Sequence, residues 1–137
     1  MYILDTNVIS ELRKARKTHP NVRKWAERLP SASLYISVIS VLELEIGILL
    51  IDRRDKEQGA ILRTWMDRHL LPTFSDRILA IDTAVAQRCA TLHVPNPRFD
   101  RDSLIAATAL VHGLTVATRN VADFERSGVG VINPWEA

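Results

Sequence analysis

Short apolar runs alternate with longer amphipathic segments along this chain. The apolar runs at residues 2–4, 34–38, 78–81, 114–118 and 129–132 predict five short buried strands. Helical spacing of apolar residues predicts helices at 6–13, 21–29, 40–47, 60–71, 84–92 and 104–112, and a turn or short helix at 120–124. Strands that alternate with helices in this way indicate an α/β fold with a mainly parallel central sheet of about five strands and helices on both faces.

Two of the predicted helices are expected to form an interaction arm. The segment 40–47 is apolar over most of its surface, so it must be buried on two sides. A polar cluster at residues 52–59 separates it from the next helix, which ends before Pro72. We therefore expect the stretch from about residue 40 to 71 to fold as a helical hairpin that offers a surface to a partner.

The helix at 104–112 has a different character. It is rich in alanine and apolar all round, so we expect it to lie buried at the centre of the fold. Gly113 follows it in the position that commonly ends a helix. The break at Pro95-Asn96-Pro97 predicts that the segment before this helix, from 95 to 101, is a loop.

Composition limits the class of protein. A chain of 137 residues with 47% hydrophobic residues can bury one core, so residues 1–137 are expected to form a single domain. The single cysteine, Cys89, excludes an internal disulfide and is typical of a reducing compartment. No apolar run approaches the roughly 20 residues of a membrane helix, and the chain opens on a strand rather than a signal peptide. We expect a cytoplasmic protein without a membrane segment.

The net charge of +2 gives little global attraction for a polyanion, but its distribution is uneven. Four basic residues, Arg13, Lys14, Arg16 and Lys17, follow the first strand closely. Such a patch can bind RNA by releasing counterions. It can equally be the solvated face of a helix, so we treat these four residues as a weak candidate for RNA binding.

Acidic and amide residues occur where the predicted strands end. Asp5 follows the first strand, Glu43 lies in the helix after the second, and Asn120 and Asp123 follow the fourth, while Asp102 opens the buried helix. The carboxyl ends of parallel strands meet at one edge of a sheet, where ligands bind in folds of this class. Each acid also has a structural explanation, because Asp and Glu cap helix N-termini. The sequence Ser40-Val41-Leu42-Glu43 even matches a capping box.

The surroundings of two acids favour a cation site over capping alone. Glu43 is flanked by Leu42 and Leu44 in an apolar helix, and Asp102 precedes a helix that is apolar all round. Buried carboxylates without a cation are costly, and several in one pocket repel one another. Oxygen ligands without a His or Cys cluster indicate a hard divalent ion, Mg²⁺ or Mn²⁺.

Four segments carry a resemblance to a known family. They are Ile3-Leu4-Asp5-Thr6-Asn7, the stretch 37–47 around Glu43, Asp102-Ser103-Leu104-Ile105-Ala106-Ala107, and Val116-Ala117-Thr118-Arg119-Asn120-Val121-Ala122-Asp123-Phe124. In this order and over the whole chain they resemble the PIN domain, and within it the VapC-like toxins of type II toxin–antitoxin systems. The closing Asn133-Pro134-Trp135 is similar to the FitB-type branch.

The resemblance implies a Mg²⁺- or Mn²⁺-dependent endoribonuclease that hydrolyses RNA phosphodiester bonds with a metal-activated water. It implies that Asp5, Glu43 and Asp102 hold the metal and are catalytic. Thr6 and Thr118 are then expected to orient these carboxylates through their hydroxyls. Some relatives have a fourth acid where this chain has Asn120, so Asn120 and Asp123 are both candidates for the fourth position.

The resemblance also implies partners, namely an RNA substrate, a cognate VapB-like antitoxin and a second copy of the chain in a homodimer. The antitoxin would insert a basic side chain among the acids. The competing hypothesis is a non-catalytic PIN-like module that binds RNA or a protein while the acids only cap helices. A phospho-accepting receiver domain fits less well, because it needs a late lysine and no lysine follows Arg119.

Overall fold

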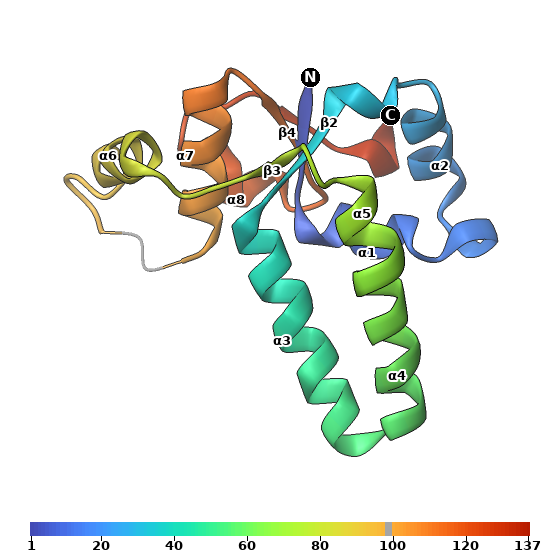
Figure 1. The fold of residues 1–137 in the computed structure, drawn as a ribbon. Helices are drawn as coiled ribbons and strands as arrows, with labels where there is room; N and C mark the ends of the chain where they lie inside the picture. Colours follow the sequence, from blue (N-terminus) through green and yellow to red (C-terminus); the bar gives the residue numbers. More distant parts are fainter. Residues whose placement is uncertain (98–99) are drawn as a thin grey trace.

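Five short parallel strands form the centre of the computed structural model, which describes residues 1–97 and 100–137 (Figure 1). They are β1 (Tyr2–Leu4), β2 (Leu34–Ser37), β3 (Ile78–Leu79), β4 (Thr115–Ala117) and β5 (Val131–Ile132). The strand order is β3-β2-β1-β4-β5, and every pairing is parallel. The predicted parallel sheet of five strands is thus confirmed. Because β1 lies in the middle, the residue that follows it stands at the centre of one sheet edge.

Helices cover both faces of this sheet. Alternate residues of a strand point to opposite faces, so Leu4 packs into one core cluster and Ile3 into the other. The Leu4 face is covered by α1 (Thr6–Leu12), α2 (Pro20–Glu27), α3 (Val38–Arg54) and α4 (Lys56–Trp65). The Ile3 face is covered by α7 (Asp102–His112) and α8 (Val121–Glu125), and α6 (Thr83–Leu92) packs on the outside of α7.

Short segments connect these elements. They are the 3₁₀ turns η1 (Ala15–Lys17), η2 (Ser31–Ser33) and η4 (Pro134–Glu136), a π-helical stretch η3 (Met66–Leu70), and α5 (Leu71–Thr73). The segment predicted as a loop after α6 has no helix or strand at residues 94–97 and at 100 and 101, and its residues 98 and 99 lie outside the described part.

The predicted hairpin is present but is longer and tighter than expected. Residues 52–59 are not a polar linker, because α3 continues to Arg54 and α4 begins at Lys56. Asp55 alone breaks the helix, and its carboxylate caps α4 by accepting the backbone N–H of Gln58 (3.0 Å). Polar residues tolerate a helix well when they are exposed and paired at i and i+4, as Lys56 is with Asp52 (3.1 Å).

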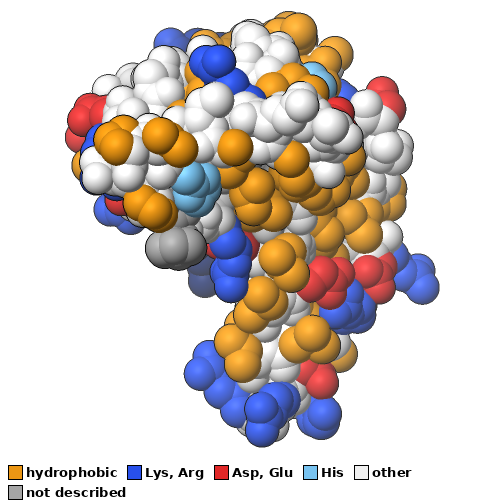
Figure 2. All heavy atoms as spheres, turned by 90° about the vertical axis from the view of Figure 1, so that its left-hand side faces the viewer, with side chains coloured by type: hydrophobic (Ala, Val, Ile, Leu, Met, Phe, Trp, Pro, Cys, Tyr) orange, Lys and Arg blue, Asp and Glu red, His pale blue; other side chains and the backbone are white. Residues whose placement is uncertain are grey.

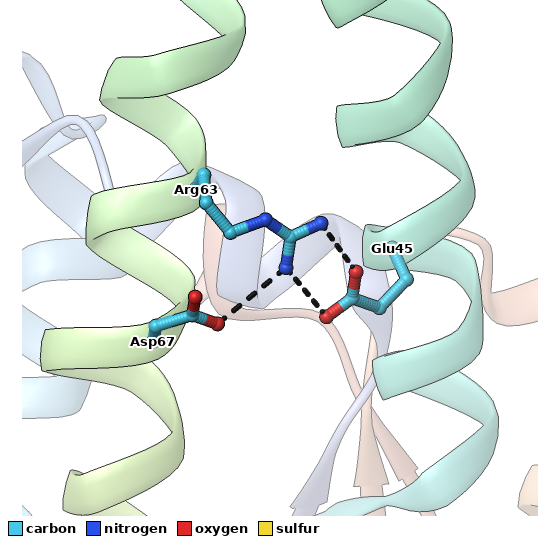
Figure 3. A network of polar contacts seen from close by, with 3 residues as sticks. All are labelled: Glu45, Arg63 and Asp67. Carbon is cyan, nitrogen blue, oxygen red and sulfur yellow. Dashed lines mark hydrogen bonds and ion pairs between the residues drawn. The ribbon is translucent and has the colours of Figure 1, made fainter.

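Ion pairs of one arginine, Arg63, connect the two helices of this hairpin (Figure 3). Arg63 of α4 donates to both carboxylate oxygens of Glu45 on α3, at 2.7 and 3.0 Å, and to Asp67 at 3.4 Å. The two parallel bonds fix distance and orientation together. The ion pair between Arg63 and Glu45 therefore sets the register of α3 against α4.

The central helix α7 matches its prediction closely. Six of its residues are buried, and it ends at Gly113, whose φ of 68° is the left-handed conformation that glycine adopts without strain. Cys89 of α6 is buried against it, as expected. Within the described residues, no helix is both long and apolar enough to span a membrane.

Candidate active site

Asp5 lies at the centre of the sheet edge, directly after β1. Its backbone N–H continues the pairing with β4 by donating to the carbonyl of Ala117 (2.9 Å). One carboxylate oxygen caps α1 through the N–H of Thr6 (2.8 Å). The other accepts the hydroxyl of Thr118 (2.7 Å) and the side-chain amide of Asn7 (3.3 Å). Asp5 is only 4% exposed, so it caps a helix and is also a buried acid aimed by residues from two strand ends.

Glu43, which lies on α3, is connected to this site through a hydrogen bond with Thr6. The Thr6 hydroxyl donates to Glu43 Oε1 (2.7 Å) and lies 3.1 Å from the hydroxyl of Ser40, one turn earlier. The capping-box alternative for Ser40 and Glu43 is wrong, because α3 begins before both residues. Its N-cap is Ser37, whose hydroxyl accepts the N–H of Ile39 (3.0 Å). Glu43 is therefore more than one turn inside the helix and free of a capping role.

Asp102 is the first residue of α7, yet it does not cap that helix either. The N-cap residue is Arg101, and the carboxylate of Asp100 accepts the N–H of Ser103 (2.9 Å). The preceding residue, Arg101, reaches across to Glu43 Oε2 (3.4 Å) and ties the start of α7 to α3. Capping thus leaves the carboxylate of Asp102 available for another role.

Charge and burial act together on these acids. Burial raises the pKa of Asp5, and the charges of Glu43 and Asp123 add to this, while hydrogen bonds from Thr118 and Thr6 oppose it. Burial, followed by the charges of Asp5, Asp123, Asp100 and Glu43, raises the pKa of Asp102 to about 6. The carboxylates therefore share one electrostatic environment, in which a proton or another cation lowers the energy. We call Asp5, Glu43, Asp102 and Asp123 the acid cluster.

The two candidates for the fourth position differ in what they contribute. Asp123 in the first turn of α8 adds its charge to both Asp5 and Asp102. Asn120 adds no charge, and its backbone N–H donates to the Thr118 hydroxyl (3.0 Å). Both side chains are exposed and line the same hollow beside the cluster. The electrostatics thus favour Asp123 as the fourth acid and leave Asn120 as a neighbour.

The acid cluster fits a hard divalent cation by charge and by donor type. All its donors are oxygens, and their mutual repulsion is the kind that a cation offsets. In the described part of the chain, however, no group of three or more His, Cys, Asp or Glu side chains is arranged so that it could hold a metal ion. Glu43 is engaged by Thr6 and Arg101. Metal binding would therefore require Glu43 or Asp102 to turn toward Asp5.

The basic residues predicted as a weak RNA site lie apart from this cluster, at the end of α1 and in η1. Lys14 pairs with Glu11 (3.0 Å), and the guanidinium of Arg13 lies over the ring of Trp65 (5.9 Å). Arg16 and Lys17 are exposed. Among the described residues, none of the four forms an ion pair with an acid of the cluster. Their role in RNA binding stays a prediction.

Sequence reasoning missed three residues that shape the site: Asn7, Ser40 and Arg101. Asn7 joins the two central strand ends, because its amide group donates to Asp5 and its carbonyl oxygen accepts the N–H of Arg119 (3.2 Å). The local signal for Ser40, its capping-box spacing with Glu43, points to a helix cap rather than to the site. Arg101 gives no local signal, because its partner Glu43 is 58 residues away.

Comparison with known proteins matches this sequence to a family. The family model for the PIN domain matches residues 2–128. The plasmid stability protein StbB of Pseudomonas syringae pv. tomato is 39% identical over 142 residues, covering 100% of both chains. The VapC ribonuclease Y4jK of Sinorhizobium fredii is 36% identical, covering 99% of each chain, and toxin FitB of Neisseria gonorrhoeae is 37% identical, covering 98% of this chain and 99% of its own.

Solved structures agree with these matches. The crystal structure of FitAcB from Neisseria gonorrhoeae superposes with a TM-score of 0.90 at 35% identity, over 100% of both chains. A toxin–antitoxin complex from Klebsiella pneumoniae gives a TM-score of 0.68 at 30% identity, again over 100% of both chains. The likeness therefore extends over the full length of each chain.

Proposed function

Since this chain belongs to the PIN domain family, we propose that it is the toxin of a toxin–antitoxin pair and cleaves RNA at the acid cluster. The observation that carries the proposal is the convergence of Asp5, Glu43 and Asp102 from three different elements, with capping excluded as the role of the last two. Full-length relatives named as a VapC ribonuclease and as a toxin support it.

In this proposal Asp5, Glu43 and Asp102 hold Mg²⁺ or Mn²⁺, with Asp123 as the fourth acid. When bound, such an ion polarises the phosphate and lowers the pKa of a water molecule so that it can attack. The chain's own contribution is orientation and charge. Thr118 and Asn7 fix the second oxygen of Asp5, and Thr6 fixes Glu43. Burial of Asp5 excludes bulk water from one side of the site and strengthens its attraction for a cation.

Two surfaces support the proposed partners. Hydrophobic side chains run along α3 and up to the body of the molecule (Figure 2), and Leu49 and Leu50 of α3 are 58% and 59% exposed. Exposed apolar patches of this kind mark protein contacts, so we assign this face to a second copy in a homodimer. We assign the groove between α1 and the segment from the end of α4 to α5, lined by Leu12, Trp65 and Phe74, to the antitoxin. Its basic side chain would approach the acids as Arg101 already approaches Glu43.

The test separates cleavage from binding. Purified protein is incubated with tRNA, rRNA and mRNA in Mg²⁺, in Mn²⁺ and in chelator. We expect cleavage only with the ions, and its loss in Asp5→Asn while RNA binding remains. The matched control is Asp76→Asn, which removes the same charge from a side chain that is 83% exposed. If neither the wild type nor any variant cuts RNA but all bind it, the non-catalytic binding module replaces this proposal.

The toxin role needs a separate experiment in cells. Induced expression of the wild type should arrest growth, and Asp5→Asn at the same protein level should not. Co-expression of the cognate antitoxin, once it is identified, should restore growth and form a complex that copurifies. Arrest by Asp5→Asn equal to that by the wild type would contradict an enzymatic toxin.

A further inference from the structure

A hollow of about 410 Å³ opens beside the acid cluster. Its wall includes Asn120 and Asp123 from the segment after β4, and Asn133 and Glu136 from the segment after β5. Arg119 completes it, and the Arg119 backbone is hydrogen-bonded to the same Asn7 that holds Asp5. The volume is in the range of small-molecule sites. The hollow thus adjoins the proposed catalytic residues and is large enough for part of a nucleotide.

Arg119 lies over an aromatic ring at this hollow. Its guanidinium lies 5.2 Å from the centroid of the Trp135 ring, and the residue is exposed. No carboxylate among the described residues forms an ion pair with Arg119. The backbone of Trp135 is held in place, because its carbonyl accepts the side-chain amide of Asn21 (2.7 Å) and its backbone N–H donates to the side-chain oxygen of Asn133 (3.0 Å). A guanidinium stacked on an aromatic ring offers its outer face to a nucleobase, as single-stranded RNA recognition uses.

The charge of the hollow indicates which part of a nucleotide it takes. The positive charge of Arg119 is matched by the negative charge of Glu136, so the hollow gives a phosphate no net attraction. The Glu136 carboxylate is exposed and has no hydrogen-bonding or ion-pair partner among the described residues. A carboxylate only accepts hydrogen bonds. The base edge that suits it best is that of guanine, which presents two neighbouring N–H donors.

We propose that this hollow binds the guanine base of a nucleotide next to the scissile phosphate. The base stacks on Arg119, which Trp135 supports from behind, and Glu136 accepts hydrogen bonds from its N–H edge. The inference rests on the proposed function, because it assigns the substrate preference of that same site. Arg119 and Glu136 bind and select substrate and take no part in bond breaking.

Cleavage kinetics test the selection directly. The substrates are short RNAs that differ only in G, A, C or U at one position beside the cleaved bond. We expect the guanine substrate to have the lowest KM, by about tenfold. Glu136→Gln should abolish this preference. Arg119→Gln should raise KM about tenfold, the order expected for loss of one stacked base, with kcat within about twofold. Arg119→Lys should not restore binding, because lysine keeps the charge but lacks the planar group.

Binding measured in the Asp5→Asn background makes the test independent of cleavage. Fluorescence anisotropy with the same RNAs should show the guanine preference, its loss with Glu136→Gln, and weaker binding with Arg119→Gln. The control is Arg88→Gln, which removes the same charge from an exposed position on α6 and should behave as the parent.

The two proposals fail in different ways. Equal affinity for all four bases, or full affinity in both Arg119→Gln and Arg119→Lys, would overturn the guanine subsite, even if the wild type cleaves RNA. Absence of cleavage by the wild type together with a guanine preference in binding would overturn the catalytic function and leave the subsite standing. If circular dichroism shows that Arg119→Gln is unfolded, Glu136→Gln and Trp135→Phe replace it, and an unchanged guanine preference in both would overturn the subsite.

Discussion

Removing the charge of Asp102 should stabilise the protein when no divalent cation is present. Burial and four neighbouring carboxylates raise the pKa of Asp102 from 3.8 to about 6, a difference worth about 3 kcal/mol if it were fully expressed. Asp102 is only half-buried, and solvent screening reduces the penalty to about 1–2 kcal/mol. The negative charge at the first position of α7 also interacts with the helix dipole, which stabilises the folded state by about 0.5 kcal/mol. The repulsion therefore exceeds the stabilisation by the helix dipole, and the free energy of unfolding of Asp102→Asn should be about 1 kcal/mol higher than that of the wild type.

The pH dependence of this gain has a definite sign. Asp102 holds its proton more tightly in the folded state than in the unfolded state, so ionising it costs stability. The penalty is absent below about pH 4, grows as the pH rises toward about 6, and stays constant above that. The stability difference between Asp102→Asn and the wild type should follow the same curve. A measurement at about pH 7.5 sees all of it, and one at about pH 4 sees almost none.

Thermal unfolding followed by circular dichroism measures the effect. In chelator at about pH 7.5, Asp102→Asn should melt about 3–5 °C above the wild type, the shift that about 1 kcal/mol gives in a domain of this size. Saturating Mg²⁺ or Mn²⁺ should raise the melting temperature of the wild type and raise that of Asp102→Asn less, because ligand binding stabilises only a competent site. Asp76→Asn serves as the control and should follow the wild type.

Two results would refute this reasoning. If Asp102→Asn melts at or below the wild-type temperature in chelator near neutral pH, the acids do not repel one another as the structure indicates. If both proteins gain equally from the divalent ions, Asp102 does not help to hold the metal. The second result would leave the electrostatic argument intact but remove Asp102 from the proposed ligands.

Three further predictions concern other parts of the molecule. Thr118→Val should lower the free energy of unfolding by about 1–3 kcal/mol and slow RNA cleavage, because Asp5 loses its 2.7 Å hydrogen bond and the N–H of Asn120 loses its acceptor. Thr118→Ser keeps the hydroxyl, so it should retain wild-type stability and cleavage. Equal losses of stability and cleavage in the two variants would count against a role for the hydroxyl. Glu11→Gln should cost about 1 kcal/mol at neutral pH, because the N–H of His19, followed by Lys14, lowers the pKa of Glu11. That stability is present above about pH 4.5 and is lost as the pH falls through the lowered pKa, so denaturant titrations of the two proteins should converge in acid and a constant gap would contradict the assignment. Leu49→Arg should produce a monomer by light scattering with unchanged circular dichroism, because the side chain is 58% exposed and its loss leaves the core intact; a dimer that persists would place the homodimer interface elsewhere.

The local pattern was sufficient for much of the fold. Alternating apolar runs and helical stripes predict the five parallel strands and the helices on both faces, because burial alone sets these periods. The burial of α7 and its end at Gly113 follow from an unbroken apolar surface and from the left-handed conformation that glycine permits. That Asp5 stands at the sheet edge also follows from its sequence, since it comes directly after a buried strand, whereas its place at the centre of that edge follows from the strand order.

Local patterns misled where a residue's partner is distant. The spacing of Ser40 and Glu43 matches a capping box, but their contacts are with Thr6, more than 30 residues earlier. The polar residues at 52–59 resemble a linker, yet only Asp55 interrupts the helices, because exposed charged residues remain compatible with a helix that packs by its other face.

The site itself depends on the tertiary structure. The hydroxyl that aims Asp5 comes from Thr118, 113 residues away, and the arginine that reaches Glu43 comes from the start of α7. The stack of Arg119 on Trp135 likewise joins the end of β4 to η4. A sequence determines which residues face the core, because that depends on near neighbours. Which carboxylates share a pocket, and which cations reach them, depends on contacts between distant segments, and these exist only once the sheet has brought the strand ends together.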